Sequence, residues 1–217
     1  MTSQLIRFPT LATVLWPALS DDRSETKQWT KQWAKQWARY IILATIGAAL
    51  LTLSAKIKIP FYPVPMTMQT FVVLALGIAY GSKLGAATVL LYLAAGVIGL
   101  PVFAGTPEKG IGLVYMMGPT GGYLLGFVVA AAATGYLAEQ GWDRKPALTF
   151  AAMLIGNLMI YIPGLIWLAD VVGWDKPIFE WGMNPFLLGD LAKIALAMLV
   201  IPAIWTIIKK PGIKKPG

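Results

Sequence analysis

The chain has 217 residues, of which 57% are hydrophobic and 13% are charged, and its mean hydropathy is +0.66. A soluble domain carries roughly 25% charged residues, so the composition excludes an ordinary soluble fold and is typical of a bundle that faces lipid. The absence of Cys and His excludes disulfides and removes the commonest metal ligands and the commonest general base. The net charge of +8 gathers at both ends beside apolar segments, which indicates an anionic membrane face rather than nucleic acid.

Residues 1–26 come first and mix apolar and polar residues without a clear period. We expect a loosely ordered or surface-lying arm, and the stretch LATVLWPALS only faintly resembles a secretory signal. Residues 27–39 contain the repeat KQWT-KQWA-KQWA, whose spacing of four places Trp and Lys on separate stripes of a helix. Since Trp favours the headgroup level and Lys favours anionic phosphates, the repeat predicts an amphipathic interfacial helix. A soluble partner-binding helix is the alternative.

Residues 40–208 are predicted to form an all-α transmembrane domain of six helices, and residues 209–217 a basic cytoplasmic tail. The second and third spans are short, and GPTGG interrupts the fourth, whose helix is expected to begin near Pro119. Asn184 and Pro185 are a capping residue and a first-turn proline for the last span. The six candidate spans are 38–56, 67–80, 83–100, 111–138, 147–170 and 185–208.

Six spans place both termini on one side, and the positive-inside rule makes that side cytoplasmic. The amino-terminal side would hold basic residues in the Trp/Lys repeat, in the two inner loops and in the tail, whereas the other side holds four. We therefore expect a multi-pass protein of the cell membrane in contact with lipid, with outer loops at about 57–66, 101–110 and 171–184.

Two of the outer loops have unusual compositions. The first contains three prolines, Pro60, Pro63 and Pro65, which restrict the backbone and lower the entropy cost of ordering, so it suits a lid over a pocket. A short connector is the alternative. The second region is rich in glycine, and its backbone amides could face a ligand. Helix packing is the alternative, most clearly for Gly122 and Gly126, which form a GxxxG pair.

Asp190 and Lys193 are the charged residues that lie well inside a predicted span. They are three residues apart and share a helix face. Intramembrane charges are costly and usually face a cavity or each other, so the pair predicts either a binding site or an ion pair that satisfies only itself. Gln69 and Asn157 are weaker candidates, and an interhelical hydrogen bond is the favoured role of Asn157.

Aromatic residues are further candidates for the walls of a binding site, and small residues are candidates for a helix-packing surface. Tyr and Trp side chains provide apolar walls with a polar tip, and the candidates for such walls are Tyr92, Tyr123, Tyr161 and Trp167. Ala44 and Ala48 form a small-residue stripe on the first span, which predicts either packing within the chain or a docking surface for another membrane subunit.

Four segments together resemble the BioY family, the biotin-specific substrate-binding components of energy-coupling factor (ECF) transporters. They are PVPMTMQTFVVLALG at 63–77, YLAAGVIGLPVFAG at 92–105, GPTGGYLLGF at 118–127 and GDLAKIALA at 189–197. The resemblance covers roughly residues 40–208 and implies a six-helix bundle with an outward-facing site closed by the loop after the first helix.

The resemblance also implies the site and the partners. Asp190 would accept the ureido hydrogens of biotin and Lys193 would donate to a biotin oxygen, since charge-assisted bonds in a dry pocket are strong. Some relatives carry Arg after GGY, where this chain has Leu124, so the biotin carboxylate would need Lys109 or backbone amides from Gly118 to Gly122. The residues predicted to bind biotin are Asp190, Lys193, Gln69, Tyr92, Lys109, Gly118, Thr120, Gly121, Tyr123 and Asn157.

As partners the resemblance implies a transmembrane coupling subunit, met by Ala44 and Ala48, and two cytoplasmic ATPases. The chain has no P-loop motif, so ATP would be hydrolysed on those other subunits, and no cofactor or metal is expected in this chain. Three other hypotheses stay open: the same fold with another small vitamin, an intramembrane enzyme built on Asp190 and Lys193, and a scaffolding membrane protein.

Overall fold

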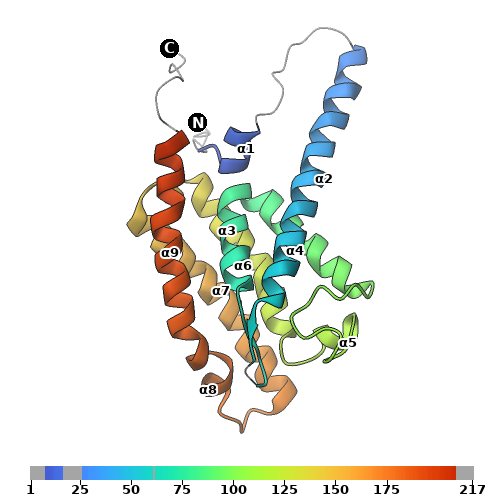
Figure 1. Cartoon of the computed structure of the whole chain (residues 1–217), viewed down its shortest axis with the longest axis vertical. Coiled ribbons are helices and arrows are strands. Elements are labelled where there is room, and N and C mark those ends of the chain that lie inside the picture. The colour runs from blue at the N-terminus through green and yellow to red at the C-terminus, as the bar shows by residue number, and fades with distance from the viewer. Residues whose placement is uncertain (1–7, 17–25, 61, 209–217) are drawn as a thin grey trace, which may run out of the picture.

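The computed structural model describes residues 8–16, 26–60 and 62–208, and for residues 26–32 it describes the backbone only. The protein is a bundle of long, roughly parallel and antiparallel helices (Figure 1). The start of α2 and the end of α9 lie at one end of the bundle, and α5 and α8 lie at the other. The elements are α1 (Leu11–Leu15), α2 (Thr26–Lys56), β1 (Lys58–Ile59), β2 (Met66–Thr67), α3 (Gln69–Tyr80), α4 (Ser82–Val97), α5 (Leu113–Met116), α6 (Gly121–Glu139), η1 (Trp142–Arg144), α7 (Pro146–Val172), α8 (Ile178–Gly182) and α9 (Asn184–Ile208).

Four helical segments are long and apolar enough to cross a membrane, and they are Trp33–Lys56, Gly121–Glu139, Pro146–Val172 and Ile178–Ile208. The other two predicted spans contain the shorter apolar helices α3 and α4. These are joined by Gly81, whose positive φ of 82° forms a turn that other residues rarely adopt. Six membrane crossings therefore stay a prediction. In that prediction α3 and α4 are too short to span the bilayer alone, and the segments packed around them would shield their ends from lipid.

α2 contains both the predicted interfacial helix of residues 27–39 and the first predicted span. The interfacial position of its first part stays a prediction. Residues 26–56 form one helix of 31 residues, about 46 Å long, and it extends past the other helices in Figure 1. The reason is that no Gly or Pro interrupts the helix before Gly47. The Trp/Lys segment thus continues in line with the span, and Trp33 and Trp37 are exposed on it.

The described part of the amino-terminal arm lies on the surface of the bundle, one of the two arrangements that its sequence allowed. Residues 8–16 include the short helix α1 and pack against the end of the bundle. The Phe8 N–H donates to the Glu139 carbonyl at 2.7 Å, and Arg39 Nη2 donates to the Ala12 carbonyl at 2.7 Å. Long-range contacts, which the local sequence does not show, therefore order this stretch. The rest of the arm and the tail 209–217 lie outside the described residues.

α6 is the central helix of the bundle and contacts α3, α4 and α7, most extensively α7. Glycine permits this approach, because a Cβ at Gly126 would lie 2.9 Å from Ile160 Cα and 3.0 Å from the Met159 carbonyl oxygen. A Cβ at Gly122 would collide with Pro163 and Trp167. Both glycines of the GxxxG pair therefore serve helix packing, the alternative that their spacing left open.

The end of the bundle opposite the start of α2 and the end of α9 carries a two-stranded antiparallel hairpin. Lys58 pairs with Thr67 and Ile59 pairs with Met66, so the proline-rich segment forms the hairpin loop. Lys56 Nζ donates to the Phe103 carbonyl at 2.9 Å, and Lys58 Nζ donates to the Ala104 carbonyl at 3.1 Å. These bonds tie the end of α2 and the first strand of the hairpin to the loop between α4 and α5, and the hairpin and this loop together cover this end of the bundle.

Candidate functional site

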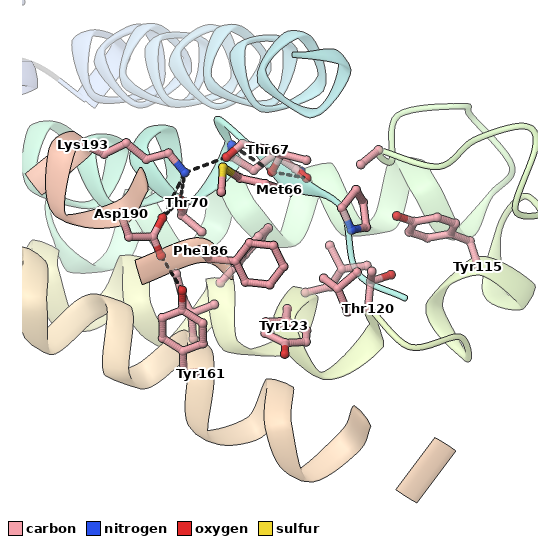
Figure 2. A pocket seen from close by; sticks show the side chains of 17 residues that line it. Met66, Thr67, Thr70, Tyr115, Thr120, Tyr123, Tyr161, Phe186, Asp190 and Lys193 are labelled. Atoms are coloured by element: carbon pink, nitrogen blue, oxygen red, sulfur yellow. Dashed lines mark hydrogen bonds and ion pairs between the residues drawn. The ribbon is translucent and has the colours of Figure 1, made fainter. Parts of the chain in front are cut away.

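A cavity lies beneath the hairpin, between α3, α6, α7 and α9 (Figure 2). Its open volume is about 60 Å³, smaller than the roughly 300–1,000 Å³ of typical ligand pockets. The lining residues are Val64, Pro65, Met66, Thr67, Gln69, Thr70, Ala104, Tyr115, Thr120, Tyr123, Leu124, Phe127, Ile160, Tyr161, Phe186, Asp190 and Lys193. A vitamin-sized ligand would therefore require the hairpin and the neighbouring walls to move apart.

Asp190 and Lys193 form the polar end of this cavity and are in direct contact. Lys193 Nζ lies 3.0 Å from Asp190 Oδ1, and the lysine and aspartate side chains are 11% and 5% exposed. The second carboxylate oxygen, Asp190 Oδ2, accepts a hydrogen bond of 2.6 Å from the Tyr161 hydroxyl. The pair is therefore buried and compensated, as an ion pair in a low-dielectric site must be.

Thr70 and Thr67 complete the network from the other side of the cavity. The Thr70 hydroxyl donates to Asp190 Oδ1 at 3.1 Å and accepts from Lys193 Nζ at 3.0 Å. Lys193 Nζ also donates to the Thr67 carbonyl at 2.8 Å. Through one lysine, the network joins α9 to α3 and to the second strand of the hairpin, while Tyr161 adds α7.

The middle of the cavity is apolar, and its far end is polar again. Phe186 and Tyr123 lie between the Asp190–Lys193 network at one end and Thr120 and Tyr115 at the other (Figure 2). Burial raises the pKa of the Tyr115 phenol above its ordinary value, so the group stays neutral at physiological pH. The site thus has an elongated shape with a charged end, apolar walls and a neutral hydroxyl-bearing end.

Five of the ten predicted binding residues line the cavity, and they are Gln69, Thr120, Tyr123, Asp190 and Lys193. Tyr92 lies behind Gln69, whose amide nitrogen donates to the Tyr92 hydroxyl at 2.7 Å. Tyr92 therefore orients a lining residue without lining the cavity itself.

The structure does not bring the other four predicted residues into the lining. Lys109 Nζ lies 3.5 Å from the Pro63 carbonyl, in the loop over the cavity. Asn157 is buried on α7, and its carbonyl oxygen has no hydrogen-bond partner among the described residues. The amide of Gly121 donates to the Gly118 carbonyl at 3.0 Å, and the amide of Gly118 donates to the Tyr115 carbonyl at 3.1 Å. Both glycine amides are thus used within the turn before α6.

Sequence reasoning missed several lining residues, of which Thr67, Thr70, Tyr115 and Phe186 are the most informative. Threonines and aromatic residues are common in apolar helices, so type and spacing did not distinguish them. One signal was present for the two threonines, since MTMQT places hydroxyls beside Gln69 at the start of α3. That both meet Lys193 depends on how α3 packs against α9.

Comparison with known proteins identifies the family of this chain. Residues 24–210 match the sequence profile of the BioY family. The chain belongs to the BioY family. The match extends beyond the 40–208 region of the predicted resemblance and takes in the Trp/Lys segment.

Two relatives of the BioY family illustrate the similarity. The protein named "Probable biotin transporter BioY" from Pyrococcus horikoshii is 37% identical over 160 residues, which are 74% of this chain and 92% of the relative. The protein named "Biotin transporter BioY" from Thermotoga maritima is 38% identical over 162 residues, 75% of this chain and 93% of the relative. Such coverage makes these proteins whole-length counterparts of the bundle.

A solved structure has the same fold as this BioY chain. It is the crystal structure of the S-component for biotin from an ECF-type ABC transporter, with a TM-score of 0.63 and 23% sequence identity. The similarity covers 79% of this chain and 93% of that structure. At this level of identity the comparison establishes the architecture of the bundle.

The predicted coupling stripe, Ala44 and Ala48, does not form an exposed surface. Ala44 is buried, and Ala48 packs against the core of the bundle. Packing within the chain, the alternative that the small-residue spacing left open, therefore accounts for Ala44 and in part for Ala48, and a contact with a coupling subunit stays a prediction. On the outward face of α2 the small residues are instead Thr45 and Ala49, both exposed.

Proposed function

We propose that this protein is the biotin-binding, substrate-specific subunit of an ECF-type transporter, and that biotin binds in the cavity under the hairpin. Membership of the BioY family carries the substrate assignment. The observation that supports the location is the buried Asp190–Lys193 pair, which lines the cavity beside Tyr161 and Thr70. The activity is binding and transport, with no chemical change in the ligand.

The charged end of the cavity fits the ureido ring of biotin. That ring offers two N–H donors and one carbonyl acceptor, and the Asp190–Lys193 pair offers the complementary acceptor and donor. In the structure these groups bond to each other and to Thr70, Tyr161 and Thr67. Biotin would exchange some of these bonds for its own, so no buried charge is left unpaired at any stage.

The opposite end fits the valerate carboxylate, where this chain has Leu124 instead of a basic side chain. The Thr120 hydroxyl lies there, immediately before α6. The first turn of a helix has backbone N–H groups without intrahelical partners and a partial positive charge. With the amides of Gly118 and Gly121 already bonded, those of Gly122 and Tyr123 are the backbone donors that we propose for the carboxylate. Phe186, Met66 and Tyr123 would pack against the thioether ring.

The hairpin is the proposed lid of this site. Val64, Pro65, Met66 and Thr67 line the cavity, and the bond from Lys193 to the Thr67 carbonyl links the lid to the binding pair. Because the cavity is narrow, entry of biotin requires the hairpin to open. Closure over the ligand would then restore the link and exclude water.

The remaining parts of the transporter follow from the family. We place both termini in the cytoplasm and the hairpin outside the cell membrane, in agreement with the distribution of Lys and Arg. ATP would be hydrolysed by two partner ATPases through a transmembrane coupling subunit. We propose the exposed face of α2 that contains Thr45 and Ala49 as the surface for that subunit, in place of Ala44 and Ala48.

Calorimetry of biotin binding to the purified full-length chain in detergent tests this function and its site. The key variant is Asp190→Asn combined with Lys193→Gln, because it removes both charges and leaves neither one unpaired. A hydrogen bond to a charged group contributes about 1.5–3 kcal/mol, so we expect affinity to fall roughly 10- to 100-fold or more. Lys176→Gln, an exposed outer-end lysine, is the matched control and should bind like the wild type.

The outcomes separate the function from the site. Tight binding by the wild type that is lost in a well-folded double variant supports both. Tight binding that survives in the double variant would support biotin as the ligand but would contradict the Asp190–Lys193 pair as its binding site. Failure of the well-folded wild type to bind biotin would contradict the substrate, and the same experiment with other vitamins would then test the alternative.

A further inference from the structure

A second cavity lies at the opposite end of the bundle from the hairpin. It is formed by α1, α2 and α4, together with the ends of α3 and α6, and its open volume is about 330 Å³. None of its lining residues lines the cavity under the hairpin. The biotin site therefore does not account for it.

Arg39 is the buried cation of this second cavity. The residue is 6% exposed, and its Nη2 donates to the Ala12 carbonyl at 2.7 Å. Its Nε is buried and has no hydrogen-bond partner, and no carboxylate forms an ion pair with it among the described residues. A buried guanidinium is costly unless an anion compensates it. Within the part of the chain that the structure describes no ion pair does so, and the arrangement therefore favours an anion that enters the cavity.

Lys83 gives the cavity a second cation. It is exposed and makes no ion pair within the described residues. Glu139 is the one carboxylate in the lining, and its Oε1 accepts hydrogen bonds of 2.8 Å from both the amide and the hydroxyl of Ser82. The carboxylate thus caps the start of α4, and the lining keeps a net charge of +1, from two cations and one anion.

The other walls of the cavity are aromatic and apolar. Trp37 and Tyr40 meet edge to face with their ring centroids 6.4 Å apart, and Tyr80 and Leu84 line the cavity from α3 and α4. Arg39 comes directly before the long apolar run of α2, and Lys83 lies in the first turn of α4. The cations and aromatic rings therefore occupy the boundary between polar and apolar surface, where lipid headgroups lie.

We propose that this cavity binds the phosphate of an anionic phospholipid, with Arg39 and Lys83 on the phosphate and the acyl chains along the apolar surfaces of α2 and α4. A soluble phosphate compound offers the same charge, but the aromatic and apolar walls would then have no partner. The bound lipid would compensate Arg39, which also holds α1 in place, and would so stabilise the docked amino-terminal arm.

Native mass spectrometry of the full-length, delipidated chain tests the proposal with phosphatidylglycerol and phosphatidylcholine of identical acyl chains. Each basic residue near a lipid surface contributes about 1 kcal/mol, or about a five-fold change in affinity. We expect the wild type to prefer phosphatidylglycerol. Lys83→Gln should reduce its affinity about five-fold, and Arg39→Gln at least as much. Lys145→Gln is the matched control, because Lys145 is an exposed cation at the same end outside this cavity.

Biotin binding by each variant serves as the test of correct folding, and Lys83→Gln keeps the experiment decisive if Arg39→Gln is unstable. Equal retention of the two lipids by the wild type, or equal losses in Lys83→Gln and Lys145→Gln, would overturn the proposal. Inorganic phosphate at millimolar concentration is the third arm. If it binds without lipid and displaces phosphatidylglycerol, the occupant is a soluble phosphate and the lipid assignment is wrong.

Discussion

Asp190 illustrates how a buried charge is kept inside an apolar bundle. One of its oxygens accepts from Lys193 and Thr70, and the other accepts from Tyr161. Each partner comes from a different position in the chain, yet together they compensate the carboxylate. A ligand with both donors and an acceptor can enter such a network by exchange, whereas a purely apolar ligand would leave charges unpaired.

Tyr161→Phe tests whether this network orients the carboxylate for biotin. The change removes a hydrogen bond to a charged group, which contributes about 1.5–3 kcal/mol, and so we expect biotin affinity to fall roughly 10-fold or more. Tyr123→Phe is the comparison variant, because the Tyr123 hydroxyl donates to the Gly182 carbonyl at 2.8 Å instead of to the network. Calorimetry that finds equal losses in the two variants would contradict an orienting role for Tyr161.

At this scale the sequence predicted the charged pair and part of its surroundings. The spacing of Asp190 and Lys193 on one helix face is a local property, since residues three apart on a helix are neighbours. The bonds from Tyr161 and Thr70 could not be predicted, because they require α7 and α3 to approach α9 at one level. For the same reason Gly118 and Gly121 were expected in the site but are used within their own turn.

The hairpin is the element that most directly controls access to the cavity. Its strands contribute two residues each, too few to hold it closed by backbone pairing alone. Side-chain bonds from Lys58 and Lys193 connect the two strands to the rest of the protein, and Lys56 at the end of α2 makes a third bond beside them. Of these three, the bond from Lys193 passes through the proposed biotin site, so ligand binding and lid closure share that residue.

Hydrogen exchange measured with and without biotin tests the lid. Biotin closes the hairpin over the cavity in our proposal, so we expect slower amide exchange in residues 58–67. The outer loop at 173–177 serves as the internal control, because it does not line the cavity. Equal protection of the two segments, or none in the hairpin, would contradict the lid.

The ends of most helices were predicted closely from the sequence, but the contacts between the helices were not. α9 begins at Asn184, one residue before the start at Pro185 that its capping sequence indicated, and α6 begins at Gly121, close to the expected start near Pro119. By contrast, α2 is one continuous helix, and α1 is held against the bundle by Arg39 and by the Glu139 carbonyl. Capping and helix-breaking residues mark where helices begin and end, but they say little about which surfaces will meet.

The whole molecule has a polar end on each side of an apolar middle. The hairpin and the loops around it form one end, and α1 with the two cations of the second cavity forms the other. In our proposal the hairpin end faces the outside of the cell and admits biotin, and the opposite end meets lipid headgroups at the inner surface. Four helical segments are long and apolar enough to cross a membrane, and the short α3 and α4 pack against α2 and α6.

Single cysteines test this orientation, since the chain has none of its own. Lys58→Cys and Lys176→Cys lie at the hairpin end, and Lys145→Cys lies at the other. In intact cells we expect a membrane-impermeant maleimide to label the first two variants, and to label the third only after permeabilisation. The reverse pattern would place the hairpin in the cytoplasm and contradict uptake from outside through this site.

The sequence by itself determined the class of protein, the positions of the helices, the family and the charged pair, because composition, capping residues and helical spacing are local. Only the tertiary structure decided which side of each helix is buried. It buried Ala44, left Lys109 and Asn157 outside the lining, and placed Thr70 and Tyr161 on Asp190. The physical reason is that burial and pairing depend on contacts between segments distant in the chain, which no local pattern specifies.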